Sequence, residues 1–206
     1  MRVAVVGGTG PFGRALAPRL LEAGHDVVVG SRDAERAQAT ALELGCVGAT
    51  NARAVADADI VILTVNADAA LATARELREA VGSTPLLSVA SELSFAKGGV
   101  FPAPEAKSLA ERIQADLDGP VVAGLHSLAA SSLGAEDPPD EDAFVCGDDP
   151  DAKALALELA ECLTAGRALD AGPLASARAL EGLTAVIVNM NKRYKGHAGI
   201  RVTGLV

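Results

Sequence analysis

The chain alternates short runs of apolar residues with glycine turns and amphipathic segments. The first apolar run covers residues 3–6, and a glycine turn, a helix-like stretch to Ala23 and a second apolar run at 27–29 follow it. Apolar runs without polar alternation are typical of parallel strands that helices cover on both faces. The pattern therefore predicts an α/β fold: a Rossmann-type, doubly wound parallel sheet with right-handed crossovers. The other expected strands are 46–49, 60–65, 85–89, 120–125, 143–146 and 167–170, and the other expected helices are 34–44, 51–56, 68–81, 105–117 and 151–163.

Three segments depart from this alternation. Residues 90–103 are rich in glycine and proline and predict a long loop, and the acidic stretch 135–142 predicts an exposed loop. Residues 175–194 predict a helix that is apolar on nearly every side, which indicates one face on the sheet and another on a second subunit. We therefore expect a main domain at 1–172, with strands added after about residue 120, and a small helical extension at 173–206.

A glycine motif follows the first expected strand. Gly8, Gly10 and Gly13 have the G-x-G-x-x-G spacing and lie between an apolar run and the start of a helix. In dinucleotide-binding units these glycines make the tight turn, admit the pyrophosphate and let the helix pack closely on the strand. The helix N-terminus adds free N–H groups and the positive end of its dipole. The motif in this position predicts a dinucleotide site.

The end of the second strand indicates which dinucleotide binds. NAD sites usually place Asp or Glu there to bond the ribose 2′-hydroxyl, whereas this chain has Ser31 and Arg32, with Arg36 one helical turn later. Arginine suits a 2′-phosphate because its guanidinium forms bidentate hydrogen bonds with phosphate. We therefore expect NADP(H). The alternative is that Ser31 caps the next helix, a role that Asp33 could also fill, and that the arginines are only solvated.

Composition excludes several classes of function. The 206 residues carry a net charge of −9 and only 2% aromatic residues, so a nucleic-acid-binding surface is not expected. The three cysteines, Cys46, Cys146 and Cys162, have no spacing for a disulfide framework or a zinc site, and no other metal site is expected. No signal peptide and no membrane span is recognisable, so the expected location is the cytoplasm.

Few residues are suited to acid–base catalysis. No Ser-His-Asp arrangement or H-E-x-x-H motif is recognisable, and the single tyrosine, Tyr194, lies in no Tyr-x-x-x-Lys pattern. His126 ends the expected strand 120–125, at the edge of the sheet where ligands bind, although it could also be a satisfied structural side chain. This scarcity favours hydride transfer between two bound cofactors, which needs close stacking and exclusion of water rather than proton transfer.

Six short runs of sequence, spread over nearly the whole chain, carry a resemblance to a known family. They are Met1–Gly10, Val28–Arg32, Ala96–Gly98, Leu125–Ser127, Val145–Asp149 and Leu169–Leu174. Together they resemble the NADPH-dependent reductases of coenzyme F420, a deazaflavin. The resemblance implies reversible hydride transfer between C4 of the nicotinamide and C5 of the deazaflavin. It also implies a C-terminal part that helps to form an apolar deazaflavin pocket, usually within a homodimer.

The resemblance also implies a role for each candidate residue. The turn 8–13 would hold the pyrophosphate, residues 64–66 would lie near the nicotinamide, and His126 with Leu128 would line the hydride-transfer pocket. The expected catalytic residue is His126, and the expected cofactor-binding residues are Gly8, Thr9, Gly10, Pro11, Phe12, Gly13, Ser31, Arg32, Arg36, Thr64, Val65, Asn66, Ser127 and Leu128.

Two departures from the family pattern lie on the side of the second substrate, at residues 128–130 and 89–94. Two alternatives therefore stay open: NADPH-dependent reduction of a flavin, quinone or small carbonyl compound, and a redox sensor that binds NADP without turnover. The basic tail at 192–201 is either solvated or a docking site for an anionic ligand tail or another subunit.

Overall fold

The computed structural model describes residues 1–205, and its centre is an eight-stranded sheet. The strand order is β10-β9-β8-β5-β4-β1-β2-β3, so the order reverses between β1 and β4 as in a doubly wound fold. The expected α/β fold class is confirmed. The strands of this sheet are β1 (Arg2–Val6), β2 (Asp26–Ser31), β3 (Val47–Thr50), β4 (Ile60–Leu63), β5 (Leu86–Ser88), β8 (Val121–Gly124), β9 (Ala143–Gly147) and β10 (Ala168–Asp170).

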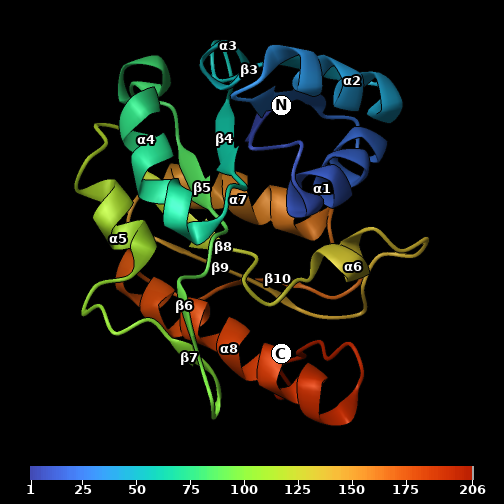
Figure 1. Cartoon of the computed structure of the whole chain (residues 1–206), viewed down its shortest axis with the longest axis vertical. Coiled ribbons are helices and arrows are strands. Elements are labelled where there is room, and N and C mark those ends of the chain that lie inside the picture. Colours follow the sequence, from blue (N-terminus) through green and yellow to red (C-terminus); the bar gives the residue numbers. More distant parts are fainter. Residues whose placement is uncertain (206) are drawn as a thin grey trace.

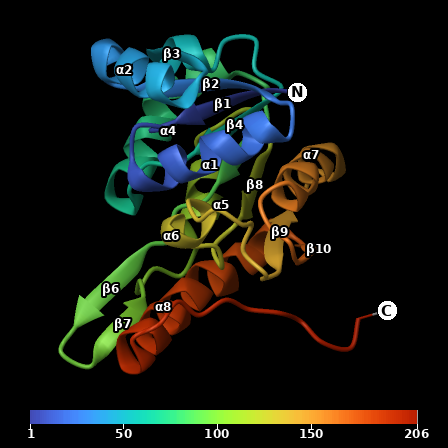
Figure 2. The ribbon, with the colours of Figure 1, turned by 90° about the vertical axis from the view of Figure 1, so that its right-hand side faces the viewer.

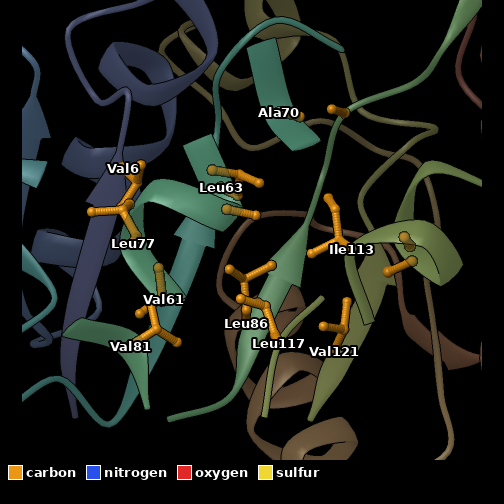
Figure 3. Packing of buried hydrophobic residues seen from close by; sticks show 14 of the residues in the cluster. Val6, Val61, Leu63, Ala70, Leu77, Val81, Leu86, Ile113, Leu117 and Val121 are labelled. Carbon is orange, nitrogen blue, oxygen red and sulfur yellow. The ribbon is translucent and has the colours of Figure 1, made fainter. Parts of the chain in front are cut away.

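Helices cover both faces of the sheet (Figure 1). Alternate residues of β1 divide between two apolar clusters: Val6 packs with α4 and α5 on one face, and Val5 packs with α1 and α7 on the other. Figure 3 shows residues of the first cluster, in which Leu77 of α4 and Ile113 of α5 lie over the sheet residues Val6, Leu63 and Leu86. The helices are α1 (Pro11–Glu22), α2 (Ala34–Leu44), α3 (Asn51–Ala54), α4 (Ala67–Val81), α5 (Leu109–Gln114), α6 (Ala130–Leu133), α7 (Pro150–Glu161) and α8 (Ala177–Tyr194), with a short 3-10 turn, η1, at Leu174–Ser176.

The sheet is parallel except at one pair. β9 pairs with β8 in antiparallel register, with Gly124 opposite Val145, and β10 continues parallel to β9. The reason lies in the connection at 125–142, which contains only the single-turn helix α6 and returns along the edge at which β8 ended. A parallel β9 would have required a crossover to the opposite edge of the sheet.

The expected loop at 90–103 is wrong in part, because these residues form a second, two-stranded sheet. β6 (Leu93–Ala96) and β7 (Gly99–Pro102) form an antiparallel hairpin in which Phe95 lies opposite Val100. The amide side chain of Asn189 on α8 accepts from the Val100 N–H at 2.9 Å and donates to the Val100 carbonyl at 2.7 Å. Figure 2 shows the hairpin beside α8, projecting from the sheet.

The helix expected at 105–117 is shorter than predicted. Ser108 caps α5 at its N-terminus, and the Glu111 side chain accepts from the Ser108 N–H at 2.8 Å to complete a capping box. The S-x-x-E signal was present in the sequence, and the helix begins directly after its serine.

The acidic stretch 135–142 is not exposed throughout, which corrects the prediction. Asp142 is fully buried and accepts hydrogen bonds from the side chain of Arg167 and from the Val202 N–H, and Arg201 pairs with Asp140. Part of the basic tail therefore lies on the acidic stretch of its own chain. Burial of Asp142 became possible because Arg167 neutralises its charge.

The three cysteines are free thiols, and only Cys146 is fully buried. Among residues 1–205, no helix combines the length and the apolarity that a membrane span requires.

Candidate functional site

A cleft of about 470 Å³ opens where the carboxyl ends of β1 and β4 separate. This position is the topological switch point, at which open α/β sheets bind their ligands. Ten of the expected cofactor-binding residues lie together in its wall. The residues that line the cleft are Gly7, Thr9, Gly10, Pro11, Phe12, Ser31, Arg32, Arg36, Asn51, Thr64, Val65, Asn66, Ala69, Thr73 and Ala130.

The backbone of the glycine turn packs closely on its neighbours, because Gly7 and Gly13 have no side chains. Gly7 has φ +76°, and a Cβ on it would lie 2.5 Å from Cγ1 of Val65. A Cβ on Gly13 would lie 2.5 Å from Cα of Gly8, so only glycine lets α1 start this close to the turn. Gly10 is the N-cap of α1 and supplies no side-chain cap, so the helix presents its first N–H groups toward the cleft. This backbone arrangement fits a pyrophosphate.

The end of β2 gives the cleft a cationic side. Asp33, not Ser31, caps α2, because its carboxylate accepts from the N–H groups of Glu35 and Arg36. Ser31 instead lies in the cleft wall and accepts from the Asp33 N–H at 3.2 Å. Arg32 and Arg36 are exposed there, and neither pairs with a carboxylate within the described part of the chain. Two unpaired guanidinium groups beside a hydroxyl suit a phosphate monoester.

The opposite wall follows β4. The Thr64 hydroxyl donates to the Val6 carbonyl at 2.9 Å and so joins the ends of β4 and β1. Asn66 is the N-cap of α4, but its side chain makes no capping bond, so its amide is available to a ligand. Residues 64–66 therefore lie with the glycine turn and the arginines in one continuous cleft.

The residues expected on the side of the second substrate lie outside this cleft. His126, Ser127 and Leu128 are all buried, with exposed fractions of 5%, 2% and 6%, and none lines the cleft wall. They follow Leu125, whose φ of +64° is strained for a residue with a side chain. This strained residue turns the chain at the end of β8, and two residues after Leu128 the chain reaches the cleft at Ala130.

His126 is buried and electrically neutral at physiological pH. Burial lowers the pKa of its imidazole to about 4, and the backbone of Ala90 offsets this only partly. Within residues 1–205, neither ring nitrogen has a hydrogen-bond partner of good geometry. The backbone of His126 is fixed instead: its carbonyl accepts from the Thr184 hydroxyl of α8 at 2.9 Å, and Thr184 is 2.7 Å from the Ser91 hydroxyl.

Comparisons with known proteins assign the chain to a family. A family model described as "NADP oxidoreductase coenzyme F420-dependent" matches residues 2–92, which contain the glycine turn, β2 and β4. An F420-dependent NADP reductase of Methanothermobacter marburgensis is 37% identical over 100% of this chain and 99% of its own length. The chain belongs to the F420-dependent NADP reductase family.

Two further relatives support the assignment to the F420-dependent NADP reductases. The F420-dependent NADP reductase of Methanothermobacter thermautotrophicus is 35% identical over 100% of this chain and 96% of its own length. A crystal structure from Arthrobacter sp. FB24, assigned provisionally to the F420-dependent NADP reductases, superposes with a TM-score of 0.86 at 27% identity. That superposition covers 99% of this chain and 100% of the other, so the similarity includes the hairpin and α8.

Sequence reasoning missed two residues that shape the cleft in this member of the F420-dependent NADP reductase family. Asn51, at the start of α3, is 8% exposed, and its side-chain oxygen accepts from the Gly7 N–H at 3.4 Å. It lines the cleft and supports the glycine turn from a segment 44 residues away in sequence. The only signal was an asparagine at the end of the third strand, which is also a common N-cap residue.

The second missed residue is Arg19, which positions α6. Arg19 is 8% exposed, and its guanidinium donates to the carbonyls of Leu133 at 3.1 Å and Glu136 at 3.0 Å, and also to that of Ala135. These carbonyls lie at and after the C-terminus of α6, where a cation is favourable. Because Ala130 of α6 lines the cleft, Arg19 holds one wall of the site from behind.

Proposed function

We propose that this chain transfers a hydride reversibly between NADP(H) and coenzyme F420. The observation that carries the proposal is the cleft at the β1/β4 switch point. Its glycine turn leaves the first N–H groups of α1 without a side-chain cap, and its two arginines have no carboxylate partner among the described residues. The chain that forms this cleft belongs to the F420-dependent NADP reductase family. Such a cleft has the donors for a pyrophosphate at one position and for a 2′-phosphate at another.

Each part of the cleft has a proposed role in holding NADP(H). The turn from Gly8 to Gly13, with Thr9, Pro11 and Phe12, binds the pyrophosphate, and Ser31, Arg32 and Arg36 bind the 2′-phosphate. Thr64, Val65 and Asn66 position the nicotinamide half. The division of the chain into an NADP-binding domain at 1–172 and an extension at 173–206 that closes the pocket belongs to the same proposal.

The proposed reaction needs little acid–base chemistry from the protein. Bound NADP(H) supplies or accepts the hydride at C4 of its nicotinamide ring. Burial keeps His126 neutral, so we propose that it contacts the deazaflavin side together with Ser127 and Leu128 as an uncharged wall. In this role His126 excludes water and fixes the distance between the reacting rings, and it does not supply a proton.

The direct test is to mix the protein, NADPH and oxidised F420 and to follow the deazaflavin absorbance. Loss of that absorbance at a rate proportional to enzyme supports the proposal. No change with F420, but NADPH consumption with a flavin, quinone or small carbonyl compound, would favour the first alternative. Tight NADPH binding without turnover on any acceptor would favour the redox sensor.

The 2′-phosphate assignment has its own test. Hydrogen bonds to charged groups contribute about 1.5–3 kcal/mol, and exposure of Arg32 places its effect at the low end, so Arg32→Ala should weaken NADP⁺ about tenfold. Its effect on NAD⁺, which has no 2′-phosphate, should stay within about twofold. Arg193→Ala, an exposed arginine at the end of α8, is the matched control. Equal losses for NADP⁺ and NAD⁺ in Arg32→Ala would contradict the assignment.

We also propose that the protein is a homodimer that pairs through α8 and the hairpin. Val186, Met190 and Tyr194 form an exposed stripe on α8 at intervals of four residues, with exposed fractions of 51%, 43% and 78%. Phe95 and Phe101 of the hairpin extend this apolar surface, at 71% and 47% exposed. An exposed surface of this kind is typical of subunit interfaces.

Light scattering coupled to size exclusion tests the dimer. Met190→Glu should shift the molar mass to that of the monomer, because it places a charge in the centre of the interface. Leu42→Glu is the control, since Leu42 is 86% exposed on α2, far from the proposed interface in sequence. A monomeric wild-type protein would refute the proposal. A cytoplasmic location and the lack of nucleic-acid and membrane partners stay predictions of the sequence.

A further inference from the structure

Asn51 lies between the two parts of the cleft that have donors for phosphate groups. It directly follows Thr50, which is the partner of Ser31 in the β2–β3 register, so it begins beside the proposed 2′-phosphate position. Its side chain reaches the other way, to the N–H of Gly7 at the start of the glycine turn. Gly7, Ser31 and Asn51 all line the same cleft. Asn51 therefore connects the proposed pyrophosphate and 2′-phosphate positions.

Close packing holds the side chain of Asn51 in place. A Cβ on Gly30 would lie 2.9 Å from Oδ1 of Asn51 and 3.3 Å from its Cα, so the missing side chain of Gly30 gives Asn51 its room. The Gly30 carbonyl accepts from the Gly8 N–H at 3.0 Å, which joins the end of β2 to the glycine turn. Three segments of the chain thus meet around one amide side chain, and a side chain packed in this way has little rotational freedom.

The amide of Asn51 keeps a free donor. Its Oδ1 faces the Gly7 N–H, and because that group is a donor, the Nδ2 group must point elsewhere. Nδ2 makes no hydrogen bond to the described part of the chain, yet it is not sealed in the interior as the Ser88 hydroxyl is. A donor in the wall of a cleft, fixed in position and without a protein partner, is available to a ligand.

The chemistry of NADP(H) supplies an acceptor for this donor. The atoms that link the pyrophosphate to the 2′-phosphate are those of the adenosine ribose. Because the 2′ oxygen of this sugar carries the phosphate, the 3′-hydroxyl is its one free hydroxyl. A hydroxyl oxygen accepts hydrogen bonds from an amide N–H.

We propose that Asn51 is a further NADP(H)-binding residue, whose Nδ2 donates to the 3′-hydroxyl oxygen of the adenosine ribose. The inference rests on the proposed function, because it requires NADP(H) to occupy the cleft. The ribose lies away from the nicotinamide, so its bond to Asn51 is the same before and during hydride transfer. Asn51 therefore contributes to the affinity for NADP(H) and not to the rate of the chemical step.

Isothermal titration of the intact protein with NADP⁺ and with 3′-deoxy-NADP⁺ tests the proposal. The wild type should bind the deoxy ligand about fivefold more weakly, which is the size of one hydrogen bond between uncharged groups. Asn51→Ala should bind the two ligands with equal affinity, because it has no donor left to lose. Asn51→Leu, a side chain of similar size without the amide, should do the same and replaces Asn51→Ala if that variant fails to fold. Asn66→Ala removes an amide from the β4 wall of the cleft and is the matched control, in which the fivefold difference should persist.

Two results would overturn the inference about Asn51. The first is equal affinity of the wild type for the two ligands. The second is a fivefold difference that persists in Asn51→Ala or Asn51→Leu, because Asn51 would then only support the glycine turn. If either result accompanies a tenfold loss of NADP⁺ affinity in Arg32→Ala, the proposed cofactor site stands and only the inference about Asn51 fails. A wild-type protein that does not bind NADP⁺ at all would contradict both.

Steady-state kinetics give a second readout. In Asn51→Ala the KM for NADPH should rise at least about fivefold while kcat stays within about twofold, since the lost bond is present in the ground state and in the transition state. A fall in kcat with an unchanged KM would contradict the proposed role.

Discussion

The carboxylate of Glu181 is buried where α8 meets α5, so this residue gives the sharpest test of how burial affects an ionisable side chain. Its side chain is 1% exposed, and Oε1 accepts from the Ala110 N–H at 3.3 Å, while Oε2 has no partner in the described part of the chain. Burial raises the pKa of Glu181 to about 7, and the N–H groups of Ala110 and Leu109 and the charge of Arg178 offset only part of this. Below about pH 7, the folded protein therefore prefers the protonated side chain.

The size and the sign of the effect follow from linkage. A shift from 4.5 to about 7 corresponds to about 3 kcal/mol, at 1.36 kcal/mol for each pH unit. Because the folded state binds the proton more tightly, stability is fully present below pH 4.5 and is lost as the pH rises to about 7. Glu181→Gln retains an acceptor for the Ala110 N–H and removes the charge. Its free energy of unfolding should equal that of the wild type near pH 4.5 and exceed it by up to about 3 kcal/mol at pH 8.

Urea unfolding of both proteins at several pH values between 4.5 and 8 measures this difference directly. Other titrating groups, including Asp142, affect both proteins equally and cancel in the difference. Glu76→Gln serves as the control, because an exposed carboxylate should give a difference that does not change with pH. If the difference between Glu181→Gln and the wild type is constant over this range, the buried carboxylate is not protonated in the folded state and the reasoning is wrong.

Three other predictions follow from buried polar groups. Arg19→Met keeps the apolar stem but leaves the carbonyls after α6 without donors, so it should lower stability by about 2–4 kcal/mol in urea and weaken NADPH through the cleft wall at Ala130. Asp142→Asn loses the charge that Arg167 and the tail bind, so trypsin should cleave the tail about tenfold faster, whereas unchanged proteolysis would mean that other contacts hold it. The rate of hydride transfer should show no ionisation of His126 between about pH 5.5 and 8, because its pKa lies near 4; a pKa near 6.5 that disappears in His126→Asn would contradict this.

The cleft at the β1/β4 switch point could be predicted because its signals are local in sequence. The apolar run at Val3–Val6, the glycine turn and the end of β2 each contain their own structural reason within a few residues. Asp33 shows the limit of that reasoning, since either Ser31 or Asp33 could have capped α2 and only the backbone path at the end of β2 decides. Ser31 is thereby left to line the cleft.

The other side could not be predicted, because its structure depends on pairs of residues that are far apart in sequence. The hairpin at 93–102 has a glycine-rich, proline-containing sequence that indicates a loop, yet Asn189 of α8 satisfies both backbone groups of Val100. Asp142 and Glu141 lie in an acidic stretch that would be solvated in isolation. Asp142 is buried only because Arg167, 25 residues later, and the tail reach it.

Non-local contacts also decide which residues of the apolar helix α8 are buried. The apolar residues of α8 point to several sides of the helix, and only some of them are buried. Ala185 and Ile187 are buried, whereas Met190 belongs to the exposed stripe. Hydrogen bonds from α8 to distant segments accompany this division: the Thr184 hydroxyl donates to the His126 carbonyl at the end of β8, and Asn189 bonds the backbone of Val100. A hydroxyl at one position of an apolar helix carries no periodic signal, although here it joins that helix to the backbone of His126. The placement of α8 beside His126 therefore depends on contacts made across the fold.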